Sequence, residues 1–251
     1  MSARLSTYPT ITLVHLYPNE MSFNGDYGNL LTLMRRLQWR NIPVELIKHR
    51  LGDALPDSID IIVGGGGQII GPSPVQNDLL SNKSHLQAYI ESDTAALLIC
   101  GSYQLFGSYI TTESNESIEG LGIFDMHTEI GEHRLTGNVI AVSERFGTVV
   151  GFENHSGKTY LNKGLSPLAM VKQGAGNNDA DKTEGVHYRS AIGSYLFGPL
   201  LPRNPAIADY LIAKALEHRI GVSFDPGELA PLPDVDGYAA LAAAATQTRP
   251  R

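Results

Sequence analysis

The only cysteine of the chain, Cys100, stands at the end of an apolar run and directly before a glycine. Residues 97–107 are LLICGSYQLFG, a pattern that predicts a strand followed by a sharp turn into a helix. A thiol on such a turn is exposed above the sheet edge, where N–H groups of the helix start lower its pKa and stabilise an oxyanion. Cys100 is therefore a candidate nucleophile. A small core residue is the alternative, because free cysteines are among the most often buried residue types.

A run of four glycines, residues 64–67, ends another apolar stretch, IDIIV. In a parallel sheet this run and Cys100 would meet at the same carboxyl edge, where open α/β folds place their active sites. Bare backbone there can donate a second oxyanion hydrogen bond or admit a substrate closely. A simple turn and a phosphate cradle are the alternatives, but no GK[ST] or GxGxxG pattern supports a nucleotide site. The combination of the two features favours a nucleophilic Cys100.

Composition limits the class of protein. The 251 residues carry a formal net charge of −7 and no run of Lys or Arg, which argues against a nucleic-acid partner. No apolar run reaches the ~18 residues that a membrane span needs. The N-terminus has no convincing secretory signal, and a single cysteine excludes an internal disulfide, so we expect a cytoplasmic protein. The histidines show no HxH or HExxH spacing, so no metal site is expected.

Strand-like and helix-like segments alternate through most of the chain. Short apolar or β-branched runs predict strands, and longer stretches with helical spacing predict helices. The predicted strands are 11–17, 43–50, 59–63 and 94–100, and the predicted helices are 27–41, 76–91 and 205–219. This alternation predicts an α/β fold, a three-layer sandwich with a central, mostly parallel sheet.

Two segments depart from this alternation. Residues 120–161 contain short, glycine-punctuated strands that suit antiparallel hairpins, so we expect a small antiparallel excursion there. Residues 173–185 predict a polar loop. Residues 220–251, rich in Ala and Pro, predict a loosely ordered tail after a single domain over 1–219.

Several motifs in order resemble one enzyme family. They are LYPNEMSFNGDYGN, VGGGGQ, ICGSYQLFG, HRLTGNV, GFENHSGKTYL, GNN followed by EGVHY, and GSYLFGPLLPRNP. Over about residues 10–219 the chain resembles class I glutamine amidotransferases of the cobyric acid synthase type. The resemblance implies that the cysteine attacks the side-chain amide of L-glutamine, forms a glutamyl thioester and releases ammonia. It also implies a partner, a Mur-ligase-type (MurT-like) synthetase that amidates the D-glutamate of lipid II in peptidoglycan synthesis.

The resemblance assigns roles to five positions of this chain. Cys100 would be the nucleophile, and Gly65, Gly66 and Ser102 would form the oxyanion pocket, mainly through backbone groups. Arg134, in HRLTGN, would bind the glutamine substrate, since paired guanidinium N–H donors suit a carboxylate. No cofactor is implied for this subunit, and ATP would belong to the partner ligase.

One position departs from the family pattern. The family places its catalytic histidine in a Y-L-H-G-P stretch, and this chain has YLFGP, with Phe197 at the histidine position. Phenylalanine can neither accept nor donate a proton, so it cannot activate the thiol. Three explanations are open: a deliberate His→Phe replacement, a natural variant with impaired glutamine chemistry, or another base.

The candidates for another base are His155, in GFENHSG, and His187, ten residues before Phe197. Both fit a structural or substrate-lining role better, as does Glu153 in the same GFENH turn. Three rival functions remain open. They are a catalytically silent regulatory or binding subunit with the same fold and partner, an amidotransferase for another acceptor such as a corrin carboxylate, and a cysteine hydrolase on a related fold.

Overall fold

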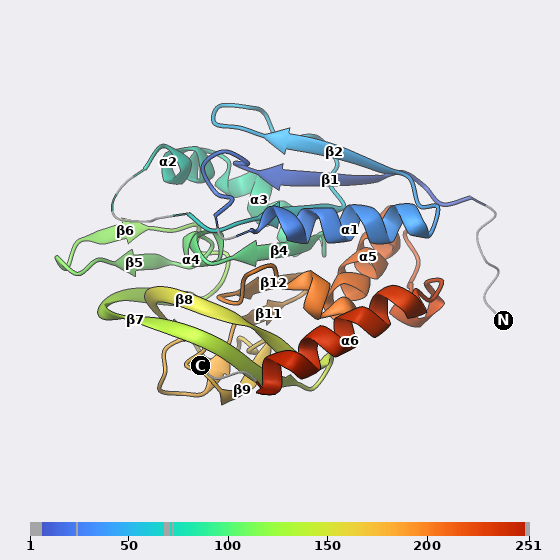
Figure 1. Ribbon diagram of the computed structural model, residues 1–251. Coiled ribbons are helices and arrows are strands. Elements are labelled where there is room, and N and C mark those ends of the chain that lie inside the picture. The colour runs from blue at the N-terminus through green and yellow to red at the C-terminus, as the bar shows by residue number, and fades with distance from the viewer. Residues whose placement is uncertain (1–6, 24, 68–70, 72, 249–251) are drawn as a thin grey trace.

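A computed structural model describes residues 7–23, 25–67, 71 and 73–248. Its first sheet has six strands in the order β11-β12-β4-β3-β1-β2 (Figure 1). Neighbours in it pair in parallel, except β11 with β12, which pair antiparallel. The strands are β1 (Ile11–Leu16), β2 (Val44–His49), β3 (Ile61–Gly64), β4 (Ala95–Ile99), β11 (Val186–Tyr188) and β12 (Ala191–Ser194). The prediction of a mostly parallel central sheet is confirmed.

Helices cover both faces of this sheet. The strands are buried on both sides, so their residues alternate between two cores. In β1, Leu13 packs in the core formed with α1 and α5, and Val14 packs in the core formed with α2, α3 and α4. The helices are α1 (Tyr27–Trp39), α2 (Pro74–Ser81), α3 (Lys83–Glu91), α4 (Gly101–Leu105) and α5 (Pro205–Ile220). The single helix expected over 76–91 is thus two helices. None of the described helices is both long and apolar enough to span a membrane.

The antiparallel part is larger than the sequence indicated. Residues 120–161 contribute two long strands, β7 (Met126–Ser143) and β8 (Gly147–Leu161), to a second six-stranded sheet beside the first (Figure 1). The other strands are β5 (Tyr109–Thr111), β6 (Ser117–Glu119), β9 (Ala169–Gln173) and β10 (Thr183–Glu184), and β10 lies within the expected polar loop. Glycines inside the long strands had suggested breaks. At Gly157 the missing side chain instead permits close packing, because a Cβ there would overlap Gln104.

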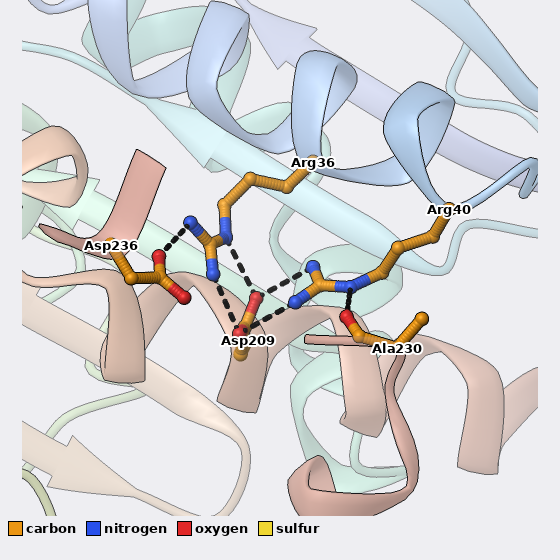
Figure 2. Close-up of polar contacts among 5 residues, drawn as sticks. All are labelled: Arg36, Arg40, Asp209, Ala230 and Asp236. Carbon is orange, nitrogen blue, oxygen red and sulfur yellow. Dashed lines mark hydrogen bonds and ion pairs between the residues drawn. The ribbon is translucent and has the colours of Figure 1, made fainter. Parts of the chain in front are cut away.

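The C-terminal segment is not the loose tail that composition suggested. After a 3-10 turn at Pro226–Glu228, helix α6 (Pro233–Thr248) lies across the molecule against β8 and the 3-10 turn Leu201–Arg203 (Figure 1). Asp209 of α5 accepts hydrogen bonds from Arg36 of α1 and from Arg40, which directly follows α1, at 2.7–2.8 Å (Figure 2). Arg36 also pairs with Asp236 of α6 at 2.7 Å, and Arg40 donates to the Ala230 carbonyl. Polar anchors of this kind, separated by about 200 residues in sequence, leave no local pattern.

Candidate active site

Cys100 occupies the strand-to-helix turn that the sequence predicted. It follows β4 and precedes α4, and its backbone has φ 51° and ψ −108°, a conformation that costs a non-glycine residue free energy. Its N–H donates to the carbonyl of Ser194 at 2.9 Å, which fixes the turn to the end of β12. Gly101 is required at the next position, because a Cβ there would lie 2.8 Å from the Gly67 carbonyl oxygen. The two glycine-ended strands therefore meet, as expected from a parallel sheet.

A cavity of about 490 Å³ opens over this turn. Three of the residues singled out in the sequence, Cys100, Arg134 and His155, line it together. Its lining comes from the ends of β3 and β4 with α4, from the turn after β5, and from β7 and β8. The other lining residues are Gly67, Gln104, Thr112, Glu113, Ser114, Ile130, Asn154, Ser156 and Gly157.

An irregularity in β7 brings Arg134 to the cavity. Ile130 pairs with Gly157 and Leu135 with His155, so four residues of β7 stand opposite one residue of β8. Such bulges redirect side chains and are common beside active sites. Arg134 donates from Nε and Nη2 to the side-chain and backbone oxygens of Asn154 at 2.8 and 3.0 Å. Asn154 thus orients the guanidinium, and among the described residues Nη1 has no hydrogen-bond partner, which leaves it for a ligand.

The surroundings of the Cys100 thiol favour its protonated form. Burial, followed by the negative charge of Asp26, raises the pKa of Cys100 to about 12. The backbone N–H of Gly101 and the positive charge of Arg134 act in the opposite direction. The helix start therefore stabilises the thiolate as expected, but the apolar surroundings have the larger effect.

The three expected oxyanion residues lie beside Cys100, but the donors of Ser102 and Gly66 are already used. Ser102 donates its hydroxyl to the Gly65 carbonyl at 2.7 Å, and its N–H points to the same oxygen at 3.3 Å. Gly66 donates its N–H to Asp26 at 2.5 Å. Gly67, which the sequence reasoning did not single out, is the glycine of the run that lines the cavity.

Asp26 is the functional-site residue that sequence reasoning missed. Its carboxylate is 3% exposed, and burial raises its pKa to about 6 although the Gly66 N–H lowers it. Its Oδ1 has no hydrogen-bond partner among the described residues. The signal was present, since Asp26 lies inside the motif LYPNEMSFNGDYGN, but nothing local to that motif indicates the contact with Gly66.

His155 lines the cavity as a neutral imidazole. Its Nδ1 donates to the Gly157 carbonyl at 2.7 Å, and its ring stacks on Tyr195 with centroids 3.7 Å apart. Burial, opposed by this hydrogen bond and reinforced by Arg134, lowers the pKa of His155 to about 4. The thiol of Cys100 has a much higher pKa, so proton transfer from that thiol to this ring is strongly unfavourable. The geometry suits a cavity wall better than a general base.

Phe197 lies in the hydrophobic core against which Cys100 packs. It is 6% exposed, its N–H donates to the Phe152 carbonyl at 3.0 Å, and the two phenyl rings contact edge to face. Its side chain offers no proton acceptor beside Cys100.

The two other candidates lie away from the cavity. His187 bonds to the Tyr210 hydroxyl at 2.9 Å and lines a separate cavity of about 550 Å³. Glu153 is fully buried and accepts the backbone N–H groups of Ala175 and Gly176, so it anchors a loop. Within the described residues, no group of three His, Cys, Asp or Glu side chains is arranged to hold a metal ion.

Comparisons with known proteins agree with this geometry. The family model of the CobB/CobQ-like glutamine amidotransferase domain matches residues 12–205. Among curated proteins, the chain is 40% identical over 220 residues to the lipid II isoglutaminyl synthase (glutamine-hydrolyzing) subunit GatD of Staphylococcus aureus (strain N315), covering 87% of this chain and 89% of that one. It is 37% identical over 225 residues to the subunit of the same name from Streptococcus pneumoniae (strain ATCC BAA-255 / R6), covering 88% and 86%.

Solved structures support the fold alone. A glutamine amidotransferase from Thermotoga maritima superposes with a TM-score of 0.53 at 11% identity, over 94% of this chain and 93% of that one. The glutaminase domain of Trypanosoma brucei CTPS, solved with bound acivicin, gives a TM-score of 0.53 at 12% identity, over 88% and 98%. From its match over residues 12–205 and its identity to relatives of nearly equal length, this chain belongs to the CobB/CobQ-like glutamine amidotransferase family.

Proposed function

We propose that the chain is the glutamine-hydrolysing subunit of a two-subunit amidotransferase that amidates the D-glutamate of lipid II, and that Cys100 is its nucleophile. The observation that carries this proposal is the shared cavity. A thiol on a strained turn and an arginine with a free donor line one space in a glutamine amidotransferase fold. The arginine suits the α-carboxylate of glutamine, and the thiol suits its side-chain amide.

The reaction would proceed in two balanced steps. Cys100 loses its proton, its sulfur bonds to the amide carbon, and the carbon–nitrogen bond breaks while the nitrogen takes up a proton and leaves as ammonia. Water then attacks the thioester, releasing glutamate and returning a proton to the sulfur. The Gly101 N–H that stabilises the thiolate, and the Gly67 backbone in the cavity wall, would stabilise the developing oxyanion. Gly66 would join them only if Asp26 released its N–H.

Proton transfer is the weak step in this chain. Phe197 supplies no base, and the low pKa of His155 makes it a poor acceptor for the Cys100 proton. Loss of one member of a catalytic triad costs several orders of magnitude in rate but leaves residual catalysis. We therefore propose an impaired glutaminase with slow thioester formation.

The acceptor and partner are inferred from the relatives. Both curated relatives are named as glutamine-hydrolysing subunits of lipid II isoglutaminyl synthase, which supports a ligase partner and a peptidoglycan precursor as acceptor. We place ATP in a Mur-type (MurT-like) partner and no cofactor in this subunit. Such a role belongs in the cytoplasm, where the precursor is made.

A catalytically silent subunit is the second candidate, and Phe197 is the observation that favours it. Such a protein would keep the fold and the partner surface without making ammonia. Cys100 would then be part of the packed core rather than a reacting group.

Labelling of Cys100 separates the two candidates. We would incubate the full chain with acivicin, a glutamine-like electrophile, and follow adduct formation by intact-mass spectrometry, with Cys100→Ser as the control. Stoichiometric labelling that L-glutamine slows supports the enzyme. An inert thiol, or labelling that L-glutamine does not slow, rejects the proposed glutamine site and favours the silent subunit.

A further inference from the structure

The cavity over Cys100 contains charges of both signs. Among its described lining residues, two side chains are charged at neutral pH, Arg134 and Glu113. His155 is neutral because its pKa is low. A free α-amino acid carries an α-carboxylate and an α-ammonium group on one carbon, so a site with one cation and one anion is complementary to it.

The topology places Glu113 on the same side of the cavity mouth as Arg134. Strand β5 runs parallel to β7, with Thr111 beside Glu129. Parallel neighbours leave a sheet at the same end, so residues 112–114 after β5 and residues 130–134 of β7 extend together. Both segments line the cavity.

Two hydrogen bonds hold the turn that carries Glu113. Thr112 receives the Glu116 N–H on its hydroxyl at 3.1 Å, and the Thr112 N–H donates to the Glu116 carbonyl at 2.9 Å. This closes a short hairpin between β5 and β6 with Glu113 near its tip. The Glu113 carboxylate forms no hydrogen bond or ion pair with any residue that the structure describes, so it is available to a ligand.

We propose that Glu113 accepts the α-ammonium group of the substrate and thereby selects a free amino acid amide over amides that lack this group. The inference rests on the proposed function, in which glutamine occupies the cavity. A carboxylate and an ammonium form a charge-assisted hydrogen bond, and Arg134 in the same cavity takes the α-carboxylate. Glu113 would thus determine specificity, whereas the chemistry stays with Cys100.

The test compares two ligands that differ only in the α-ammonium group. L-Glutamine has it, and 4-carbamoylbutanoate keeps the carboxylate and the amide without it. We would titrate both into the full chain carrying Cys100→Ser, so that neither reacts, and measure affinity by calorimetry. Glu113→Gln removes the charge, and Glu116→Gln removes an exposed charge from the same hairpin outside the cavity lining.

We expect Glu113→Gln to weaken L-glutamine binding about tenfold, the size of a charge-assisted hydrogen bond. Binding of 4-carbamoylbutanoate should not change, and Glu116→Gln should affect neither ligand. If Glu113→Gln leaves the ratio of the L-glutamine and 4-carbamoylbutanoate affinities unchanged, the inference is overturned. It is also overturned if Glu116→Gln has an equal effect, because that would indicate a general electrostatic effect of the hairpin's charge. If the unmutated cavity binds no L-glutamine at all, the proposed function fails and this inference fails with it.

Discussion

Asp26 accepts the Gly66 N–H at 2.5 Å, and the same carboxylate faces Cys100 closely enough to raise the pKa of its thiol. One side chain therefore affects both the expected oxyanion donor and the candidate nucleophile. Asp26 and Gly66 are 40 positions apart in sequence, and α1 begins directly after Asp26.

Asp26→Asn is expected to lower the pKa of Cys100. The negative charge of Asp26 raises that pKa, so a neutral side chain of the same shape removes the effect and leaves burial. Each unit of decrease gives about tenfold more thiolate below the pKa. Because Cys100 is the only cysteine, thiolate absorbance and the pH dependence of iodoacetamide labelling report on it alone. An unchanged or higher pKa would contradict this account.

The positive φ of Cys100 predicts an unusual order of stability at that position. Glycine adopts this conformation without a Cβ penalty, whereas alanine retains the penalty. Cys100→Gly should therefore exceed Cys100→Ala in free energy of unfolding by about 1 kcal/mol, although glycine usually destabilises. Urea denaturation measures the difference. Ile99 precedes the turn and has no positive φ. There the usual order of unfolding free energies is expected, with Ile99→Ala more stable than Ile99→Gly.

Glu184 makes stability depend on pH near neutrality. It is fully buried, it accepts the Ser194 hydroxyl and the Tyr195 N–H through Oε1, and burial raises its pKa to about 7. Because the folded pKa exceeds the unfolded value of 4.5, the folded state binds the extra proton. The stabilisation that this extra proton gives the folded state is complete below about pH 4.5 and is lost as the pH rises to about 7. The free energy of unfolding changes by on the order of 3 kcal/mol over this range.

Glu184→Gln should flatten this pH dependence, because an amide does not titrate. The measurement is the free energy of unfolding between pH 4.5 and 8 for both proteins. Exposed Glu119→Gln serves as the control and should keep the slope of the parent. An equal slope in the parent and in Glu184→Gln would show that the carboxyl group is not the source.

The anchor of the C-terminal segment predicts unequal effects of two aspartates. Asp209 accepts four hydrogen bonds from Arg36 and Arg40, both 2% exposed, so its loss leaves buried Arg40 without a carboxylate and Arg36 with Asp236 alone. Asp209→Asn should cost about 3 kcal/mol of unfolding free energy. Asp236 is 36% exposed, so Asp236→Asn should cost less than about 1 kcal/mol of unfolding free energy. Thermal unfolding tests the order, and the reverse order would contradict it.

The features that were predictable from the sequence have local causes. Apolar runs and helical spacing determine the parallel sheet and its helices, and the glycine after Cys100 indicates the turn. The contact of Asp26 with Gly66 and the docking of α6 depend on side chains that meet only in the folded chain. Similarly, the irregularity that presents Arg134 depends on how β7 pairs with β8. Patterns along the chain carry no register information of that kind.

Amino-acid composition was a misleading guide to whether the segment after residue 220 is ordered. The Ala-rich stretch after residue 220 has few large apolar residues, which suggested a loose tail. Alanine is also the best helix former, and α6 packs against β8 and the 3-10 turn Leu201–Arg203, with Asp236 paired to Arg36. Two glycines within β8 misled in the same way, since a Cβ at Gly151 would overlap Leu196 and one at Gly157 would overlap Gln104.

The last prediction concerns the position of the family's histidine. Phe197→His introduces a proton acceptor in the core against which Cys100 packs, and general acid–base catalysis contributes about 10²-fold or more. Glutamate release from L-glutamine, measured with the partner ligase present, should rise by that factor. The buried imidazole should cost about 1–3 kcal/mol of stability, which thermal unfolding would show. Phe152→His, in the ring that contacts Phe197, is the matched control and should lose stability without gaining activity. Equal rates before and after Phe197→His would mean that position 197 does not limit catalysis, and the base would have to be sought in the bound partner.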